Sequence, residues 1–179
     1  MGAQLIRFPT VHDASGNLTP FEERDIPFSI ARVFILHDIV EGARRGGHAH
    51  HVLEELIIAV SGSFDVVTLD EHGPHRWHLN RADSGLHVPP GVWRSLSDFS
   101  GNAVALVLAS TPFDPEDYIR DQAEFVASLP PILGNPHDAL YVEATQAYYD
   151  VLERTGDRQA ATDARSEIFF REIGVKHDS

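Results

Sequence analysis

The sequence predicts a mainly-β fold of short antiparallel strands with a C-terminal α-helical extension. Between residues 31 and 110, apolar stretches alternate with Gly, Pro, Asn and Asp at intervals of about 8–12 residues, which is typical of a sandwich or barrel. Helical periodicity follows after residue 110. With 179 residues, 42% of them hydrophobic, the chain is long enough for one core domain. We expect this domain, ending in a helix, over residues 1–129 and the helical extension over residues 130–179.

Apolar segments bounded by turn residues are the strand candidates. The stretches "DEHGP" and "NRADSG" separate some of them, because their residues tolerate tight backbone conformations. In "HRWHLN", Trp77 and Leu79 alternate with Arg76 and His78, so one face of that strand is expected to be buried. The candidates are "ARVFILHD", "LEELIIAVSG", "SFDVVTLDE", "HRWHLN", "GLHVP" and "NAVALVLAS".

The region after Ser110 carries helix signals. "TPFDPEDYIRDQAEFVASLPP" predicts a helix with Asp114 as its N-cap and Pro115 at its first position. Pro130 and Pro131 end this helix, because proline cannot continue the helical hydrogen bonding.

Two further helices are expected beyond Asn135. Each shows apolar residues at helical spacing, and such stripes must be buried against the core domain, a partner subunit or another protein. The stripes are Leu140, Ala144, Ala147, Tyr148 and Val151 in the first helix and Ala161, Ala164 and Ile168 in the second.

Composition narrows the classes of function. The formal net charge of -13 repels polyanions, so neither nucleic acid nor an anionic membrane is expected as a partner. The chain has no cysteine, which excludes thiolate catalysis, and its single lysine, Lys176, makes Schiff-base chemistry unexpected. The first residues are unlike a secretory signal, and no run reaches the roughly 20 apolar residues of a membrane helix, so we expect a cytoplasmic protein.

The stretch "GARRGGHAHHVLEEL" concentrates the residues suited to chemistry. On a β-strand, side chains two positions apart point to the same face, so His48 and His50 would stand side by side. One interpretation is a pair of exposed strand histidines. The other is a site in which Glu55 joins the two imidazoles while Arg44 and Arg45 attract a small anion.

The spacing of these residues resembles the first motif of the cupin superfamily. The stretch from Gly85 through "HVPPGVWR" resembles the second cupin motif. The resemblance implies a cupin β-barrel, or jelly roll, whose interior receives the two imidazoles. The first motif reads Gly42, five residues, His48-Ala49-His50, four residues, Glu55, six residues and Gly62.

Metal-binding cupins similar to this one place a histidine at the position of Arg94. An arginine keeps its proton at workable pH, so it cannot be a ligand, and its charge repels a cation. His48, His50 and Glu55 alone could hold a divalent metal with open positions, which is one alternative. The other, which we favour, is a site without metal or cofactor that binds an anionic ligand and moves protons through its histidines.

Longer segments of the chain are similar to the nucleotide-linked sugar 3,4-ketoisomerases, cupins that act on dTDP-4-keto-6-deoxyglucose in deoxyaminosugar pathways. The similarity extends from Gly16 to Phe125. It implies an isomerase that takes a dTDP-linked keto-sugar and forms a homodimer. The segments that carry it are "DIPFSIARVFIL", "RRGGHAHH", "GSFDVVTLDE", "GLHVPPGVWRSLSDFS" and "AVALVLASTPFDPEDYIRD".

The implied reaction moves a carbonyl from C4 to C3 through an enediol-like intermediate, which requires proton removal at C3 and proton delivery at C4. Histidine suits both steps, because its ordinary pKa of about 6.5 lets it give and take protons near neutral pH. The resemblance makes His48 and His50 the acid and the base, in either order.

The implied substrate also carries a diphosphate and a nucleoside. A diphosphate needs donors that stay charged, for which Arg44 and Arg45 are the first candidates and Arg32 and Arg94 the next. Trp93 is expected either to stack on the nucleobase or sugar, or to be buried in the core.

The chain departs from the family pattern at three positions. The strand "VFILHD" lacks a tyrosine that relatives often carry near the sugar, and His37 is a candidate substitute. Glu55 stands where glutamine is common, and Arg94 stands where histidine is common. An added carboxylate would either bind a metal or raise the basicity of a neighbouring histidine.

Two other functions therefore stay open beside the ketoisomerase. A metal-dependent cupin enzyme would use His48, His50 and Glu55 as its ligands. A sugar-nucleotide binding module without catalysis would use the helical extension to dock a transferase.

Overall fold

Short strands form most of the chain that the structure describes. The computed structural model describes residues 2–71, 73–129, 143, 144, 147, 150, 151 and 154–172. The strands are β1 (Gln4–Arg7), β2 (Val11–Asp13), β3 (Gly16–Leu18), β4 (Arg32–Leu36), β5 (Arg45–His50), β6 (Glu55–Ser61), β7 (Phe64–Asp70), β8 (Gly73–Leu79), β9 (Ser84–Val88), β10 (Trp93–Ser97), β11 (Val104–Ala109) and β12 (Tyr118–Ile119).

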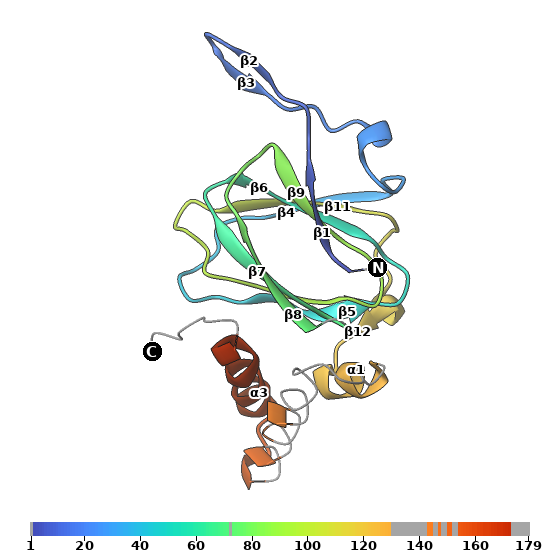
Figure 1. Ribbon diagram of the computed structural model, residues 1–179, viewed down its shortest axis with the longest axis vertical. Coiled ribbons are helices and arrows are strands. Elements are labelled where there is room, and N and C mark those ends of the chain that lie inside the picture. Colours follow the sequence, from blue (N-terminus) through green and yellow to red (C-terminus); the bar gives the residue numbers. More distant parts are fainter. Residues whose placement is uncertain are drawn as a thin grey trace.

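The strands form two five-stranded sheets that face each other (Figure 1). Sheet one has the order β1-β9-β6-β11-β4, and sheet two has the order β12-β5-β10-β7-β8. The strands pair antiparallel throughout these two sheets. The hairpin β2-β3 projects from the body of the molecule. The predicted jelly roll is confirmed, and its described strands hydrogen-bond within two sheets rather than around one closed barrel.

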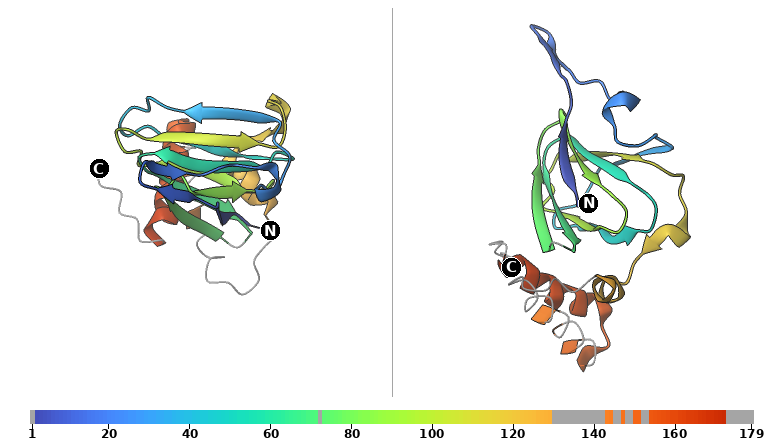
Figure 2. Two further views of the ribbon diagram at one scale, coloured as in Figure 1. Left: turned by 90° about the horizontal axis from the view of Figure 1, so that it is seen from above. Right: turned by 45° about the vertical axis from the view of Figure 1, so that its right-hand side comes forward.

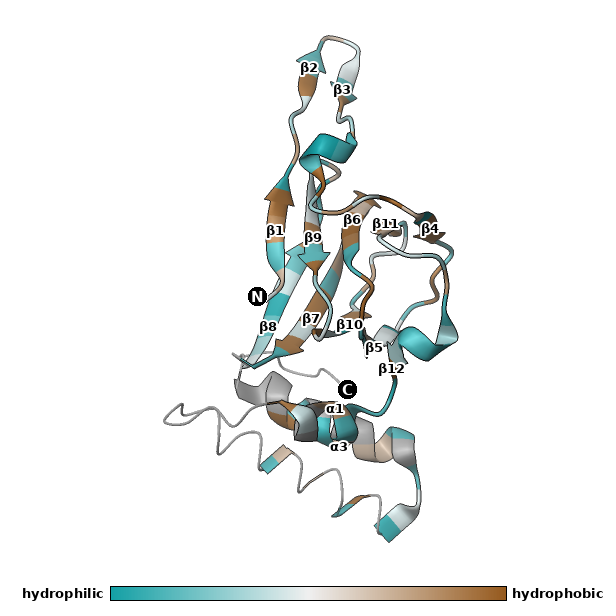
Figure 3. Ribbon diagram, turned by 90° about the vertical axis from the view of Figure 1, so that its right-hand side faces the viewer, coloured by the Kyte–Doolittle hydropathy of each residue, from teal (hydrophilic) through white to brown (hydrophobic). Residues whose placement is uncertain are grey.

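The main hydrophobic core lies between the two sheets. Sheet one contributes Ile57 and Val107, and sheet two contributes Phe64, Val66 and Leu96, each no more than 3% exposed. Burying a side chain of this size stabilises the fold by about 1.5–3 kcal/mol. Figure 3 shows hydrophobic residues concentrated on the strands of both sheets.

Strand β6 is buried on both faces, which explains its uninterrupted apolar sequence. Ile57 faces the core between the sheets, whereas Leu56 and Ile58 belong to a second hydrophobic cluster. Phe8 and Phe28 from the N-terminal segment join this second cluster, so that segment covers the outer face of sheet one.

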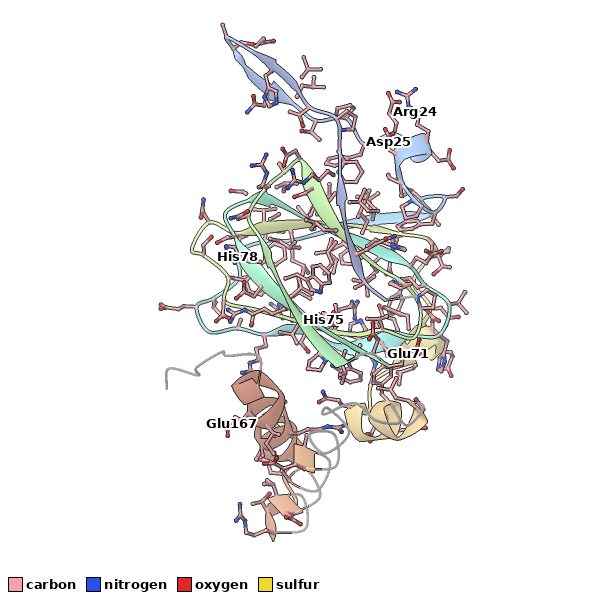
Figure 4. The ribbon with its side chains drawn as sticks, in the orientation of Figure 1. Arg24, Asp25, Glu71, His75, His78 and Glu167 are labelled. Atoms are coloured by element: carbon pink, nitrogen blue, oxygen red, sulfur yellow. The ribbon has the colours of Figure 1, made fainter. Side chains whose placement is uncertain are left out.

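Strand β8 shows the predicted alternation. Leu79 is buried and Trp77 is half-buried, while Arg76 and His78 are exposed. Both exposed side chains bond to the carboxylate of Asp65 on β7, and His78 does so at 2.6 Å. His75 and His78 are labelled on this strand in Figure 4.

Helices lie beneath sheet two, on the side away from sheet one (Figure 2). They are α1 (Gln122–Ser128) and α3 (Arg158–Glu172). The described residues between 143 and 155 are also helical. Ala144 and Ala161 of the predicted stripes are fully buried, and Ile168 packs against the same cluster as Ala144. The described part of the extension is therefore mostly helical, and it packs against sheet two.

Part of the predicted extension falls outside the described residues, including Leu140, Tyr148 and both prolines of the predicted helix stop. Within the described chain, no helix is both long and apolar enough to cross a membrane.

The single helix predicted to run from Pro115 to the proline stop is wrong over its first half. Asp114 does cap a helix, since its side chain accepts a hydrogen bond from the Glu116 N–H, but this is the one-turn 3-10 helix η2 (Pro115–Asp117). The short strand β12 then follows, and only Gln122–Ser128 form an α-helix. Tyr118 leaves the helical path because its backbone pairs with His50 on β5.

Candidate functional site

The two histidines of the HAH motif lie side by side on β5. Their rings are almost perpendicular, with centroids 4.9 Å apart. Ala49, between them, is fully buried in the cluster on the outer face of sheet two. The strand alternation therefore places His48 and His50 on the inner face of sheet two, as predicted.

A glycine lets β5 reach this position. Gly46 has a φ of +76°, a left-handed conformation that favours glycine, and a Cβ there would lie 2.9 Å from the carbonyl oxygen of Arg94. The register between β5 and β10 shifts at the same place, and His48 then pairs with Arg94. The glycine-rich start of the motif thus allows a close approach between the two strands that carry the site.

Tyr118 lies against both imidazoles. Its ring centroid is 4.6 Å from that of His48 and 4.4 Å from that of His50. Its backbone pairs with His50 through β12, which holds the phenol at the edge of the site. Tyr118 is absent from the predicted site because the cap and proline signals of Asp114 and Pro115 favour a helix through this segment.

Glu55 and Arg94 form a buried ion pair next to the histidines. Arg94 Nε is 2.5 Å from Glu55 Oε2, and Nη2 is 2.8 Å from Oε1, so both carboxylate oxygens are engaged. Arg94 also donates to the backbone oxygen of His48 at 3.0 Å. Both side chains are at most 6% exposed. Arg94 therefore closes the inner end of the site and is not placed as an open anion-binding group.

This pair does not fit the three-ligand metal alternative. A bidentate arginine occupies both oxygens of Glu55, and its positive charge lies where a cation would have to bind. Among the described residues, no group of three or more His, Cys, Asp or Glu side chains gathers in a way that could hold a metal ion.

Asp117 contacts the Nδ1 atom of His50, whereas Arg94 lies near its Nε2 atom. The Oδ2 atom of Asp117 is 3.0 Å from His50 Nδ1, and the Asp117 side chain is 10% exposed. The same carboxylate accepts hydrogen bonds from the backbone N–H groups of Val52 and Leu53. Asp117 is also absent from the predicted site, because an acidic residue in the first turn of the predicted helix is an ordinary helix signal.

Both histidines are held neutral. Burial, then the charge of Arg94, lowers the pKa of His48 to about 3, while a hydrogen bond to the backbone of Gly46 opposes the shift. Burial and Arg94 also lower the pKa of His50, against the charges of Glu55 and Asp117. The Nε2 atom of His48 is buried and has no hydrogen-bond partner among the residues that the structure describes. A neutral imidazole with a free nitrogen lone pair is a proton acceptor.

Arginines and aromatic rings form the rim of the site. Arg120 stacks over the Tyr118 ring, 4.3 Å from its centroid, and its charge contributes to the lowered pKa of His48. Arg32 lies over Phe113, which is 61% exposed, at 5.6 Å. Arg32 belongs to the same end of the sandwich, because it pairs with Ala109, which pairs with Glu55.

The other two predicted diphosphate ligands, Arg44 and Arg45, are exposed side chains. Arg44 is 3.6 Å from Asp163 of α3, an ion pair between two half-exposed side chains. Arg45 is exposed at the start of β5, opposite Leu96 and several residues from the histidines. Arg44 thus contacts the helical extension, and Arg45 lies on the strand of the histidines, three positions before His48.

Trp93 and His37 also lie away from the histidines. Trp93 is buried on the outer face of sheet two, where its ring centroid is 5.5 Å from that of Phe125, so it is the core residue of the two predicted alternatives. Arg32 begins β4, and His37 follows the last residue of that strand. The His37 side chain is exposed and paired with Asp38. The tyrosine ring that contacts His48 in this structure is that of Tyr118, which comes from another strand.

The chain is similar to proteins of one family in sequence and in structure. Residues 1–129 match the model of the family described as "FdtA: WxcM-like, C-terminal". The TDP-4-oxo-6-deoxy-alpha-D-glucose-3,4-oxoisomerase of Aneurinibacillus thermoaerophilus is 38% identical over 126 residues, which are 70% of this chain and 91% of that protein.

Solved structures agree with this match. The sugar 3,4-ketoisomerase QdtA from Thermoanaerobacterium thermosaccharolyticum, in complex with TDP, is similar with a TM-score of 0.69 and 35% identity, covering 72% of this chain and 94% of that one. A 3,4-ketoisomerase from Helicobacter canadensis is similar with a TM-score of 0.67 and 36% identity, covering 70% and 95%.

Proposed function

The chain belongs to the FdtA, WxcM-like family of sugar 3,4-ketoisomerases, and on this premise we propose that it converts dTDP-4-keto-6-deoxyglucose into the corresponding 3-keto sugar. The observation that carries the proposal is the 38% identity to an oxoisomerase whose name specifies this substrate. The side chains support it independently, because two neutral imidazoles stand side by side and the proposed reaction depends on proton transfer.

The first step in the proposal is proton removal from C3 by His48. No described residue bonds to its Nε2, its other ring nitrogen is left for the hydrogen bond to the Gly46 backbone, and its lowered pKa keeps the ring unprotonated at neutral pH. The C–H electron pair forms a C3–C4 double bond, the carbonyl electrons move to O4, and O4 takes a proton, which gives an enediol. Positioned acid-base groups of this kind contribute about 10²–10⁴ to a rate.

The second step reverses the sequence at the neighbouring carbon. The hydroxyl on C3 loses its proton, the carbonyl re-forms at C3, and the double-bond electrons take a proton at C4. We assign the proton transfers between the two oxygens to His50, whose ring lies 4.9 Å from that of His48. Protons and electrons balance within the sugar, so the step requires no oxidant.

Arg32 and Arg120 are the diphosphate ligands in this proposal, in place of Arg44 and Arg45. Arg32 and Arg120 lie at the site end of the sandwich, and each stacks on an aromatic ring that fixes its guanidinium. A guanidinium held in this way binds two phosphate oxygens at once with little loss of freedom. Within the described part of the chain, the buried Nε of Arg32 has no hydrogen-bond partner, so a donor is available there.

A homodimer in the cytoplasm completes the proposal. The hairpin β2-β3 projects from the body and exposes Val11 and Leu18, each at least 60% accessible (Figure 1). The edge strand β4 exposes Val33 and Ile35. Exposed apolar residues on an edge strand and a hairpin favour association with a second copy. Analytical ultracentrifugation of the full chain tests this, and a monomer at micromolar concentration would contradict it.

Proton NMR of dTDP-4-keto-6-deoxyglucose incubated with the full chain in deuterated water tests the reaction. The proposal expects a 3-keto sugar that carries deuterium at C4, also after treatment with a chelator. Activity that is lost on chelation and restored by a divalent metal would instead support a metal-dependent enzyme. Binding of dTDP without any change in the sugar would support the binding module.

A further inference from the structure

We propose that Asp117 is a positioning residue that holds His50 in the tautomer with its proton on Nδ1 and its lone pair on Nε2. The inference rests on the proposed function only for its effect on turnover. The tautomer itself follows from the contacts of the two imidazole nitrogens with Asp117 and Arg94.

Both polar neighbours of His50 require the same tautomer. A carboxylate only accepts hydrogen bonds, so the 3.0 Å contact with Asp117 needs a proton on Nδ1. A guanidinium only donates, so the 3.4 Å contact with Arg94 Nη2 needs a lone pair on Nε2. Glu55 Oε1, the acceptor that could compete for a proton on Nε2, lies 3.8 Å away, beyond hydrogen-bond distance.

The carboxylate is itself fixed in place. Its Oδ1 accepts from the Val52 N–H at 2.7 Å and its Oδ2 from the Leu53 N–H at 3.2 Å. The backbone oxygen of Asp117 accepts from the His51 N–H at 3.0 Å. Asp117 thus binds both the side chain of His50 and the three backbone N–H groups that follow it, so the carboxylate cannot turn away from the ring.

This geometry determines what an asparagine would do at the same position. The short bond from Val52 would select the amide oxygen, which places the amide NH₂ against His50 Nδ1. Since an NH₂ group donates, Nδ1 would then have to accept, and the proton would move to Nε2. The proton-accepting atom of His50 would be lost. The same replacement in the Ser-His-Asp triad of serine proteases lowers kcat by about 10⁴ through the wrong tautomer.

The primary test is ¹⁵N NMR of the histidine rings in the full chain without substrate, with His50 assigned by its absence in His50→Gln. We expect His50 in the wild type to be protonated on Nδ1 and unprotonated on Nε2 at pH 7. In Asp117→Asn we expect the two nitrogens to exchange these states. Protonation of Nε2 in the wild type would overturn the proposal, whether or not the protein turns over substrate.

Kinetics provide the second test. Asp117→Asn should lower kcat by about 10²–10⁴ with a much smaller change in KM. The matched control is Asp114→Asn, which removes an exposed carboxylate from the same segment that caps η2 and does not contact His50. A kcat of Asp117→Asn close to that of the control would overturn the role.

A double-mutant cycle separates positioning from general structural support. In a His50→Gln background, Asp117→Asn should cause little further loss, because its effect passes through the imidazole. Independent, additive losses would show that Asp117 only supports the loop and would contradict the proposal. The NMR result stands even if the wild type fails to isomerise the sugar, so failure of the tautomer and failure of the proposed function are distinguishable.

Discussion

The two faces of β5 carry different parts of this protein. His48 and His50 point inward to the ion pair of Glu55 and Arg94, within the residues that match the family. Ala49 points outward into a cluster that includes Ala144, which lies beyond those residues. One strand therefore connects the proposed chemistry of the family to a helical extension that this chain adds.

Burial has different consequences on the two faces of β5. On the inner face, burial lowers histidine pKa values and leaves a nitrogen lone pair available, at a cost in folding free energy. On the outer face, burial of Trp93 against Phe125 and the helices stabilises the fold. Changes on the inner face should therefore affect turnover first, and changes on the outer face should affect stability first.

The largest effect on turnover is expected for a substitution on the inner face. His48→Gln removes the free Nε2 base and should lower kcat by about 10²–10⁴, with a small change in KM. Steady-state kinetics with the dTDP-linked keto-sugar measure this. His37→Gln is the matched control, since that exposed histidine lies at the far end of β4 and should leave kcat unchanged. Equal kcat values for the two variants would contradict the division between the faces.

The next effect is expected on the outer face. Ala144→Asp places a carboxylate in a fully buried apolar position and should lower the free energy of unfolding by about 2–4 kcal/mol. Thermal and urea denaturation measure the change, and the exposed position Glu167→Ala is the control. At temperatures where the variant stays folded, its kcat should remain near that of the wild type. A loss of kcat without a loss of stability would show that the extension takes part in the chemistry.

The pH dependence of the free energy of unfolding is a further difference between the two faces of β5. The pKa of His48 is about 3 in the folded protein, below its ordinary value of about 6.5, so the unfolded chain binds more protons between these pH values. The stability that depends on neutral His48 is fully present above pH of about 6.5 and is lost as the pH falls toward the folded value.

His48→Gln should remove this part of the pH dependence. Relative to the wild type, the variant should gain stability as the pH is lowered from about 6.5 toward 3. Urea denaturation of both proteins at several pH values measures the difference, and the contributions of other groups cancel. Parallel stability curves over this range would show that His48 titrates normally.

The smallest effect is expected for Arg44. Its ion pair with Asp163 joins half-exposed side chains, and such pairs contribute about 0–1 kcal/mol. Arg44→Ala should therefore leave KM unchanged and cost little stability, whereas Arg120→Ala should raise KM because it removes a proposed diphosphate ligand. A higher KM in Arg44→Ala, reduced by added salt, would return Arg44 to the substrate site.

Local sequence patterns predicted the sandwich and the histidine pair well. Strand alternation depends only on neighbouring residues, so it placed His48 and His50 on one face and identified β4, β6, β7, β8, β9 and β11. The resemblance to the second cupin motif, rather than a local pattern, indicated that Arg94 would lie opposite the histidines, and Arg94 is paired with His48 on the neighbouring strand.

The positions of Tyr118, Asp117 and Arg44 depend on long-range contacts, which local sequence patterns do not predict. Tyr118 and Asp117 reach the histidines because β12 pairs with β5 across more than 60 positions of the chain, and that pairing overrides a strong local helix signal. Arg44 is adjacent to the site in sequence but binds α3, a contact that depends on how the extension folds back. Trp93 fitted two interpretations, because alternation fixes which residues share a face and does not identify which face is the inner one.

The most direct test of the account is hydrogen exchange at C3 of dTDP-4-keto-6-deoxyglucose, followed by proton NMR in deuterated water with wild type and His48→Gln. The account predicts loss of the C3 proton signal with the wild type. With His48→Gln it predicts a persistent C3 signal while dTDP still binds. Rapid C3 exchange in His48→Gln would contradict the assignment of His48 as the base, and with it the role given to the buried inner face of β5.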